Sequence, residues 1–134
     1  MTKNLSTVLI VFIFVAVCAV PSYSEPVHCT ECGMMVDLNS KFSARLVKKD
    51  TANYFCDIGD MFSYINRKGA PDAKLEVKDH ATGDWIDANK AFYVRSEKLF
   101  KTPMGWGIAS FKDRNEALKS GIVLDFDGMT KAIK

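Results

Sequence analysis

Long runs of charge of one sign are absent from the sequence, and their absence excludes one class of partner. The 134 residues carry 18 basic and 16 acidic side chains, which gives a formal net charge of +2. The two signs are interspersed, and no basic run exceeds the pair Lys48 and Lys49. Proteins that bind nucleic acid through its phosphates need a basic patch or stripe. We therefore do not expect nucleic acid to be a partner of this chain.

The sequence also lacks an apolar run long enough to cross a membrane. The N-terminal run, residues 8–20, follows a basic residue and as a helix would extend about 20 Å, against a hydrocarbon core of roughly 30 Å. A short apolar run of this kind is typical of a secretory signal peptide. Ser22 and Ser24 provide the small residues of a leader-peptidase site, so residues 1–24 are predicted to be a signal peptide. Residues 25–134 would then be exported to the periplasm.

Lipid attachment at Cys18 is the alternative fate of this leader, and it would tether the protein to a membrane. A bacterial lipobox usually has a small residue before its cysteine, whereas Val17 stands here, so the soluble product is favoured. Cleavage after residue 24 removes one of the four cysteines and leaves Cys29, Cys32 and Cys56. An odd number of cysteines in an exported protein leaves at least one thiol without an internal disulfide partner.

Hydrophobic periodicity and helix-capping signals predict an α+β fold with one compact domain. The expected elements of the first half are strands at residues 42–47, 51–56 and 74–78 and a helix between Asp57 and Gly69. Those of the second half are strands at residues 85–86, 91–95, 108–111 and 122–126 and a helix between Asp113 and Gly121. Because the two halves, residues 37–80 and 81–128, have nearly the same order of elements, we predict two related ββαβ units.

The first two cysteines of the exported chain, Cys29 and Cys32, have a spacing that suits three kinds of site. These are a redox dithiol, a structural zinc site and a soft-metal site. A redox dithiol is expected at a strand-to-helix junction, which the sequence does not predict here. A zinc site needs four ligands, and the two cysteines with Cys56 and either His28 or His80 would supply them. All three kinds of site remain open from this spacing alone.

Four methionines close to the cysteine and glycine motifs favour the soft-metal alternative over core filling. They are Met34, Met35, Met61 and Met104. Thiolate and thioether sulfur are soft, polarizable donors that together favour Cu(I) over zinc or hard cations. With Asp57 as the N-cap of a helix, Cys56 and Met61 occupy the two positions of a hydrophobic staple and should touch. The positive helix terminus would also stabilise a Cys56 thiolate.

Residues 102–107, with the sequence TPMGWG, form a constrained loop in which Met104 stands between a proline and a glycine. From such a loop a methionine could swing onto a metal, and Trp106 could shield Cu(I) from water and oxygen or serve as a packing anchor. His28 is expected to be solvated or to supply a nitrogen ligand, and His80 to lie at the surface. No nucleophile with an oriented base is apparent, so an enzyme is not expected.

Four motifs in this order resemble the NosL family, whose members are accessory proteins of nitrous oxide reductase. The motifs are C-x-x-C-G-M at residues 29–34, F-C-D-x-G-D-M at 55–61, W-I-D-A at 85–88 and T-P-M-G-x-G at 102–107. The resemblance implies a fold of two related ββαβ halves. It also implies a periplasmic Cu(I)-binding protein, often a lipoprotein, that delivers copper for the copper centre of the reductase. The implied partners are nitrous oxide reductase and a membrane ABC-transporter complex for its assembly.

Carried over onto this sequence, the motifs of the family match six candidate metal ligands. They are Cys29, Cys32 and Met34 in the first motif, Cys56 and Met61 in the second, and Met104 in the third. Two or three of these donors, open on one side, would hold one Cu(I) and let a recipient displace them one at a time. Alternatively, Cys29 and Cys32 could form a disulfide in an oxidising compartment, which would leave the other two motifs to supply the site.

Overall fold

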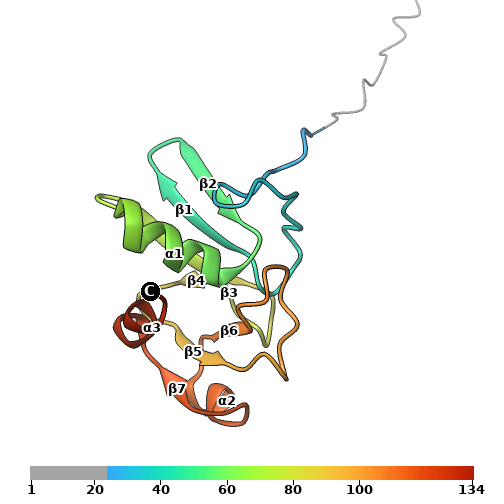
Figure 1. Cartoon of the computed structure of the whole chain (residues 1–134), viewed down its shortest axis with the longest axis vertical. Helices are drawn as coiled ribbons and strands as arrows, with labels where there is room; N and C mark the ends of the chain where they lie inside the picture. Colours follow the sequence, from blue (N-terminus) through green and yellow to red (C-terminus); the bar gives the residue numbers. More distant parts are fainter. Residues whose placement is uncertain (1–23) are drawn as a thin grey trace, which may run out of the picture.

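The computed structural model describes residues 24–134, which fold into two antiparallel β-sheets with three helices packed on them (Figure 1). The predicted signal peptide, except for its last residue, and the alternative lipid attachment at Cys18 lie outside the described residues. Among residues 24–134, no helix combines the length and the apolar character that crossing a bilayer would require.

The first sheet has four strands in the order β2-β1-β3-β4. They are β1 (Ala44–Lys48), β2 (Thr51–Phe55), β3 (Lys74–Lys78) and β4 (Trp85–Asp87), and each neighbouring pair is antiparallel. β1 and β2 form a tight hairpin in which Lys48 lies opposite Thr51. Lys49 adopts a positive φ of 51° in the turn between them. The predicted hairpin is therefore confirmed, although β1 begins two residues later than Phe42.

The second sheet has three strands in the order β6-β5-β7. They are β5 (Phe92–Arg95), β6 (Ile108–Phe111) and β7 (Val123–Leu124), again all antiparallel. Helix α1 (Ile58–Lys68) follows β2, and helix α2 (Arg114–Leu118) follows β6. Each half is thus a ββαβ unit whose first strand lies between the other two. This topology confirms the predicted α+β fold of two related halves.

Two elements differ from the predictions. The residues of β4 were expected in a strand of the second half, but β4 pairs with β3 in the first sheet. A turn closed by the hydrogen bond from the Gly83 N–H to the Asp79 carbonyl, 2.7 Å long, brings the chain back beside β3. Phe126 was expected to end a strand, but it begins helix α3 (Phe126–Ala132). Asp125 caps that helix by accepting a hydrogen bond from the Gly128 N–H at 2.7 Å.

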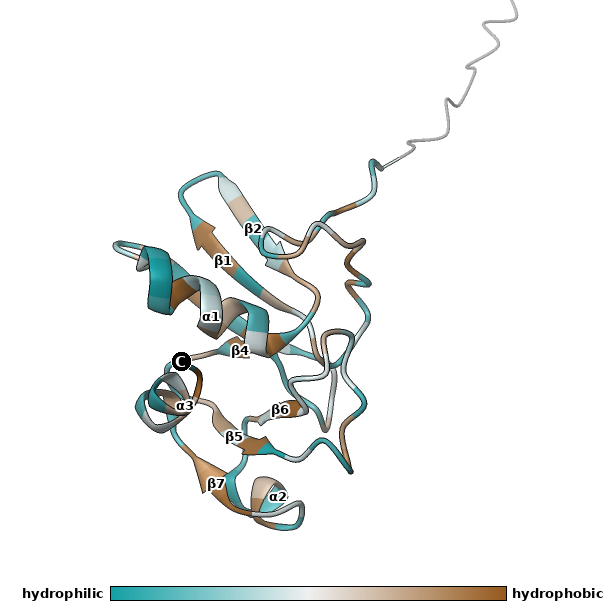
Figure 2. Cartoon of the chain, in the orientation of Figure 1, coloured by the Kyte–Doolittle hydropathy of each residue, from teal (hydrophilic) through white to brown (hydrophobic). Residues whose placement is uncertain are grey.

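Helix α1 packs between the two halves and is the element on which the site is built. It begins after Asp57 and ends at Gly69, as predicted, and Gly69 has a positive φ of 71°, which glycine adopts readily. The ring of Phe62 packs against Tyr93 of the second sheet and against Phe126 of α3, with ring centroids 5.2 Å apart in both pairs. Hydrophilic residues gather at the far, C-terminal turn of α1 (Figure 2). The N-terminal turn of α1 is therefore the buried end.

Candidate metal site

Three cysteine sulfur atoms converge at the N-terminus of α1. The Sγ atoms of Cys29, Cys32 and Cys56 and a carboxylate oxygen of Asp60 all lie within 4.8 Å of one another. The sulfurs of Cys32 and Cys56 are 3.4 Å apart. All three cysteines are free thiols; Cys29 and Cys56 are buried, as is Asp60, whereas Cys32 is partly exposed. The structure therefore joins the first and second sequence motifs into one cluster of donor atoms.

The segment that carries Cys29 and Cys32 is a tight turn anchored on β2. The N–H of Gly33 donates a hydrogen bond to the carbonyl of Cys29 at 2.9 Å. Gly33 has a φ of 76°, a conformation that other residues rarely adopt. The N–H of Thr30 donates to the carbonyl of Tyr54 on β2 at 2.8 Å. The turn is thereby held beside the end of β2, where the chain leads directly into the next cysteine.

Cys56 stands between β2 and α1, immediately before the N-cap. Asp57 has the extended dihedral angles of an N-cap, and its Oδ1 accepts a hydrogen bond from the Gly59 N–H at 3.1 Å. The predicted cap is confirmed. Because the cap fixes the backbone where the strand turns into the helix, the position of the Cys56 side chain is set by regular structure on both sides.

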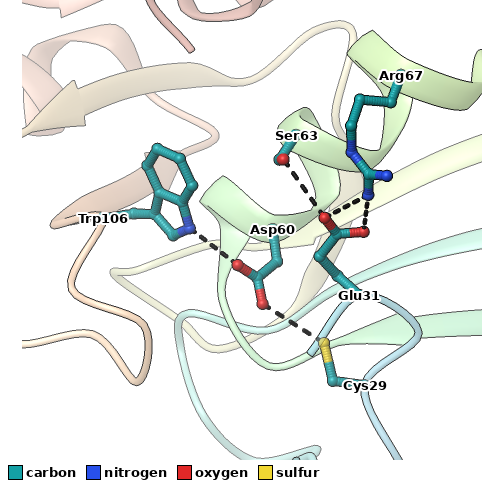
Figure 3. Close-up of polar contacts among 6 residues, drawn as sticks. All are labelled: Cys29, Glu31, Asp60, Ser63, Arg67 and Trp106. Carbon is teal, nitrogen blue, oxygen red and sulfur yellow. Dashed lines mark hydrogen bonds and ion pairs between the residues drawn. The ribbon is translucent and has the colours of Figure 1, made fainter. Parts of the chain in front are cut away.

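Asp60, in the first turn of α1, contributes the oxygen of the cluster. Its Oδ2 accepts hydrogen bonds from the thiols of Cys29, at 3.5 Å, and Cys56, at 3.6 Å. Its Oδ1 accepts a hydrogen bond from the indole Nε1 of Trp106 at 2.8 Å (Figure 3). The carboxylate is buried and receives three donors. Asp60 is thus held in one orientation, with one oxygen directed to the indole and the other to the thiols.

The loop at residues 102–107 closes over the start of α1. The N–H of Met104 donates to Oδ2 of Asp57 at 3.0 Å. The indole ring of Trp106 packs on Gly59 so closely that a Cβ at that position would lie 2.0 Å from the ring. Only glycine therefore fits under the ring. Of the two roles expected for Trp106, the structure supports that of a packing anchor, since the side chain joins the loop to α1.

Burial controls the protonation of the thiols. It is the main cause that raises the pKa of Cys56 far above the ordinary value, and the hydrogen bond with Cys32 and the nearby Cys29 raise it further. Burial also raises the pKa of Cys32, although a hydrogen bond from the Met34 N–H opposes the shift. The helix terminus was expected to stabilise a Cys56 thiolate, but desolvation outweighs it. Without metal, these two thiols are protonated at neutral pH, and a metal that binds them must displace their protons.

Comparison with known proteins identifies the family of this chain. The sequence model of the NosL family matches residues 21–133. The chain belongs to the NosL family. Its fold is similar to the crystal structure of the copper chaperone NosL from Shewanella denitrificans, with a TM-score of 0.65 and 21% sequence identity. That similarity covers 84% of this chain and 98% of the other, and at this identity it concerns the fold alone. No curated protein matches the chain.

The methionines predicted as ligands lie in different environments in this NosL-family chain. Met34 and Met104 are 49% and 43% exposed, and Met35, beside the first, is 69% exposed. The backbone of Met34 is hydrogen-bonded to Cys32 of the cluster, whereas that of Met104 is hydrogen-bonded to Asp57, the N-cap beside it. Met61, by contrast, is fully buried in α1 and belongs to the same hydrophobic core as Cys56.

The two histidines contribute no atom to the cluster of cysteines and Asp60. His28 is exposed, and its Nδ1 lies 3.1 Å from the carbonyl oxygen of Gly33. His80 was expected at the surface, but it is partly buried among the rings of Phe42, Phe100 and Phe111, with centroid distances of 5.1 to 5.6 Å. These rings come from three separate segments, so a sequence pattern around His80 gives no sign of the enclosure.

The fourth member of the cluster, Asp60, is the site residue that sequence analysis missed. In the sequence it stands inside the second motif, residues 55–61, and is an acidic residue in the first turn of the helix that follows Cys56. Such a residue is usually explained by the helix dipole. The resulting donor set of three sulfur atoms and one oxygen suits a soft metal held by thiolates, and it also matches the ligand types of zinc.

Proposed function

We propose that this NosL-family chain is a periplasmic Cu(I) metallochaperone that delivers copper for assembly of the copper centre of nitrous oxide reductase. The observation that carries the proposal is the convergence of the sulfur atoms of Cys29, Cys32 and Cys56. Thiolate ligands select soft metals such as Cu(I). Membership of the NosL family and the similarity to a structure described as a copper chaperone support the proposal.

The three thiols are proposed to bind one Cu(I) as thiolates, with two or three of them ligating at a time. Each thiolate that forms releases a proton, and Oδ2 of Asp60 already accepts hydrogen bonds from two of the thiols. Metal binding to these two thiols therefore replaces the hydrogen bonds that they donate to Asp60. Because burial raises the pKa of Cys32 and Cys56, Cu(I) affinity is expected to fall as the pH is lowered.

Transfer requires a route by which a ligand of the recipient reaches the metal. Cys32 is the only one of the three cysteines that is not fully buried, so exchange is proposed to begin at this ligand. Met34, Met61 and Met104 are proposed as additional soft donors. The exposed pair, Met34 and Met104, would hold departing Cu(I) at the rim without any proton transfer, because a thioether is neutral.

The cellular side of the proposal rests on the sequence and the family. The predicted signal peptide supports a periplasmic location, with a lipid tether through Cys18 as the alternative. The proposed recipient is nitrous oxide reductase, reached together with its membrane ABC-transporter assembly complex. The chain binds and hands over a metal ion and breaks no bond of a substrate, so it is not proposed to be an enzyme.

Asp60 favours a structural zinc site as a second candidate function. Three thiolates and one carboxylate oxygen would complete the closed, four-coordinate site that is typical of structural zinc. Zinc in such a site contributes directly to folding, so its removal by a chelator would unfold the protein. A chaperone, in contrast, must remain folded after it has released its metal.

Anaerobic titration of the reduced protein with Cu(I), in competition with a chromophoric chelator, tests the proposal. We expect one Cu(I) per chain by native mass spectrometry and two or three sulfur neighbours by X-ray absorption. Cys56→Ser should weaken binding by roughly a hundredfold or more, since loss of even an outer-shell partner costs about 10–100-fold. Met129→Leu, which alters a buried methionine of α3, is the control and should bind as the wild type does.

Two results would overturn the chaperone proposal. One is a protein that takes up no Cu(I), or takes it up equally well without Cys56. The other is a protein that contains zinc and unfolds when the zinc is chelated, which would favour the structural site instead. Circular dichroism of the metal-free protein distinguishes these outcomes from simple misfolding.

A further inference from the structure

Glu31 lies inside the C-x-x-C segment, but its side chain contacts α1 instead of the sulfur atoms. Ser63 Oγ donates a hydrogen bond to Oε1 of Glu31 at 3.4 Å. Nη2 of Arg67 donates to both carboxylate oxygens of Glu31 (Figure 3). Ser63 and Arg67 are one turn apart on the same helix that carries Asp60 in its first turn. The carboxylate of Glu31 thus joins the cysteine turn to the helix at the site.

Contacts of two kinds hold the cysteine turn against neighbouring elements. Next to Cys29, the backbone N–H of Thr30 is bonded to the carbonyl of Tyr54 on β2 at 2.8 Å. Next to Cys32, the anchor is the side chain of Glu31. A backbone hydrogen bond to a sheet strand is a persistent contact, whereas an ion pair at the surface is weak and screened by salt. The end of the turn that carries Cys32 is therefore the end held by the weaker anchor.

We infer that Glu31 is a positioning residue of the proposed metal site: its contacts with Ser63 and Arg67 hold Cys32 against Cys56 and slow the departure of Cu(I). This inference rests on the proposed function. The side chain of Glu31 is 19% exposed and that of Arg67 is 54% exposed, so the pair contributes little to global stability. Its effect falls instead on the one partly exposed ligand, where exchange is proposed to begin.

The inference predicts that salt speeds the release of the metal. Counterions screen an exposed ion pair, so high salt weakens the contact between Glu31 and Arg67 and frees the turn. Transfer of Cu(I) from the wild-type protein to a chelator should therefore become faster from low to high salt. Glu31→Gln keeps the shape of the side chain but removes its charge. In this variant the release of Cu(I) should be fast at low salt and at high salt.

The experiment measures the rate of Cu(I) transfer to a chromophoric chelator by anaerobic stopped flow, together with thermal unfolding. At low salt, Glu31→Gln should release Cu(I) roughly two- to fivefold faster than the wild type, the scale expected from one exposed charge pair. Its unfolding temperature should stay close to that of the wild type.

Glu116→Gln is the matched control, because it removes a similar exposed pair with Lys119, 2.6 Å long, on α2. The exchanged pair Glu31→Arg with Arg67→Glu should restore slow, salt-sensitive release.

Three results would overturn the inference. Release from Glu31→Gln at the wild-type rate would show that the contact does not control Cys32. An equal acceleration in Glu116→Gln would show a general effect of charge. A fall in unfolding temperature that accounts for the faster release would make Glu31 a structural residue only. A wild-type protein that binds no Cu(I) would instead remove the proposed function, and this inference with it.

Discussion

The sulfur atoms of Cys32 and Cys56 lie 3.4 Å apart, although 24 residues separate them in the sequence. A C-x-x-C spacing suggests a disulfide between Cys29 and Cys32, but in the structure Cys32 contacts the cysteine of the other motif. Treatment of the metal-free protein with a small-molecule disulfide should therefore form the Cys32–Cys56 bond by thiol–disulfide exchange, while the reagent is reduced to two thiols. Alkylation followed by peptide mapping should find Cys29 as the remaining free thiol.

Single variants provide the controls for this cross-link. Cys29→Ser should form it as the wild type does, and bound metal should protect against it because the metal occupies both sulfurs. A bond found mainly between Cys29 and Cys32, whose sulfurs also lie within 4.8 Å of each other, would contradict the preferred pairing of Cys32 with Cys56.

Gly59 and Trp106 form the contact that holds the loop at residues 102–107 on α1. Replacement of a helical glycine by alanine usually stabilises a protein by up to about 1 kcal/mol. At Gly59 the sign should reverse, because the new Cβ would lie 2.0 Å from the indole ring. We expect Gly59→Ala to lower the free energy of unfolding by about 1–3 kcal/mol, the usual cost of overpacking. Urea unfolding measures this change, and tryptophan fluorescence reports displacement of the ring.

A double-mutant cycle separates the steric effect from helix propensity. In a Trp106→Ala background the ring is gone, so Gly59→Ala should be neutral or slightly stabilising. Equal destabilisation in both backgrounds would mean that the ring does not cause it.

Much of the fold could be predicted from local sequence patterns. The cap at Asp57, the stop at Gly69 and the hairpin between β1 and β2 each depend on residues close together in the chain, and all three are confirmed. Two elements differ from the predictions: β4 is a strand as predicted but joins the first sheet, and α3 begins at Phe126, where the end of a strand was predicted. Phe126 follows Ile122 and Leu124 at alternate positions and so resembles the end of a strand, and the glycine at position 128 conceals the start of α3.

The candidate site also contains residues that local sequence patterns predicted and residues that they did not. The soft donors were identified because cysteine and methionine are rare and their clustering is visible in the sequence. Asp60 was missed because its role comes from the bond to Trp106, 46 residues away, and from two thiols that approach from different segments. A contact between segments of this separation leaves no periodic signal. His80 was placed at the surface for a similar reason.

The proposed thioether ligands can be tested without disturbing the core. Met61 is fully buried, so Met61→Ala would cost about 2–5 kcal/mol of stability and confuse the result. Leucine keeps the volume and removes the sulfur, at a usual cost below about 1.5 kcal/mol. If Met61 or Met104 ligates Cu(I), the corresponding leucine variant should bind it roughly tenfold or more weakly, on the scale of losing a supporting ligand contact. Competition with a chromophoric chelator provides the affinity.

Met35→Leu is the control for this series, because Met35 is exposed and outside the proposed ligand set. Unchanged affinity in both Met61→Leu and Met104→Leu would show that the thiols bind Cu(I) without these methionines. The thiol site would be unaffected by that result, since it depends on the cysteines alone.

His80 should make the stability of the protein depend on pH. Burial among the phenylalanine rings and the charge of Lys41 lower its pKa below 6.5, while Asp79 opposes the shift. Just below pH 6.5 the unfolded chain therefore binds a proton that the folded protein does not, so stability is complete above that pH and declines as the pH falls. A single group changes the free energy of unfolding by at most about 1.4 kcal/mol per pH unit.

His80→Phe retains an aromatic ring and cannot titrate, so its free energy of unfolding in urea should decline less between pH 7 and about pH 5 than that of the wild type. Parallel curves for the two proteins would contradict the enclosure of His80, because a solvated imidazole would take up its proton equally in both states.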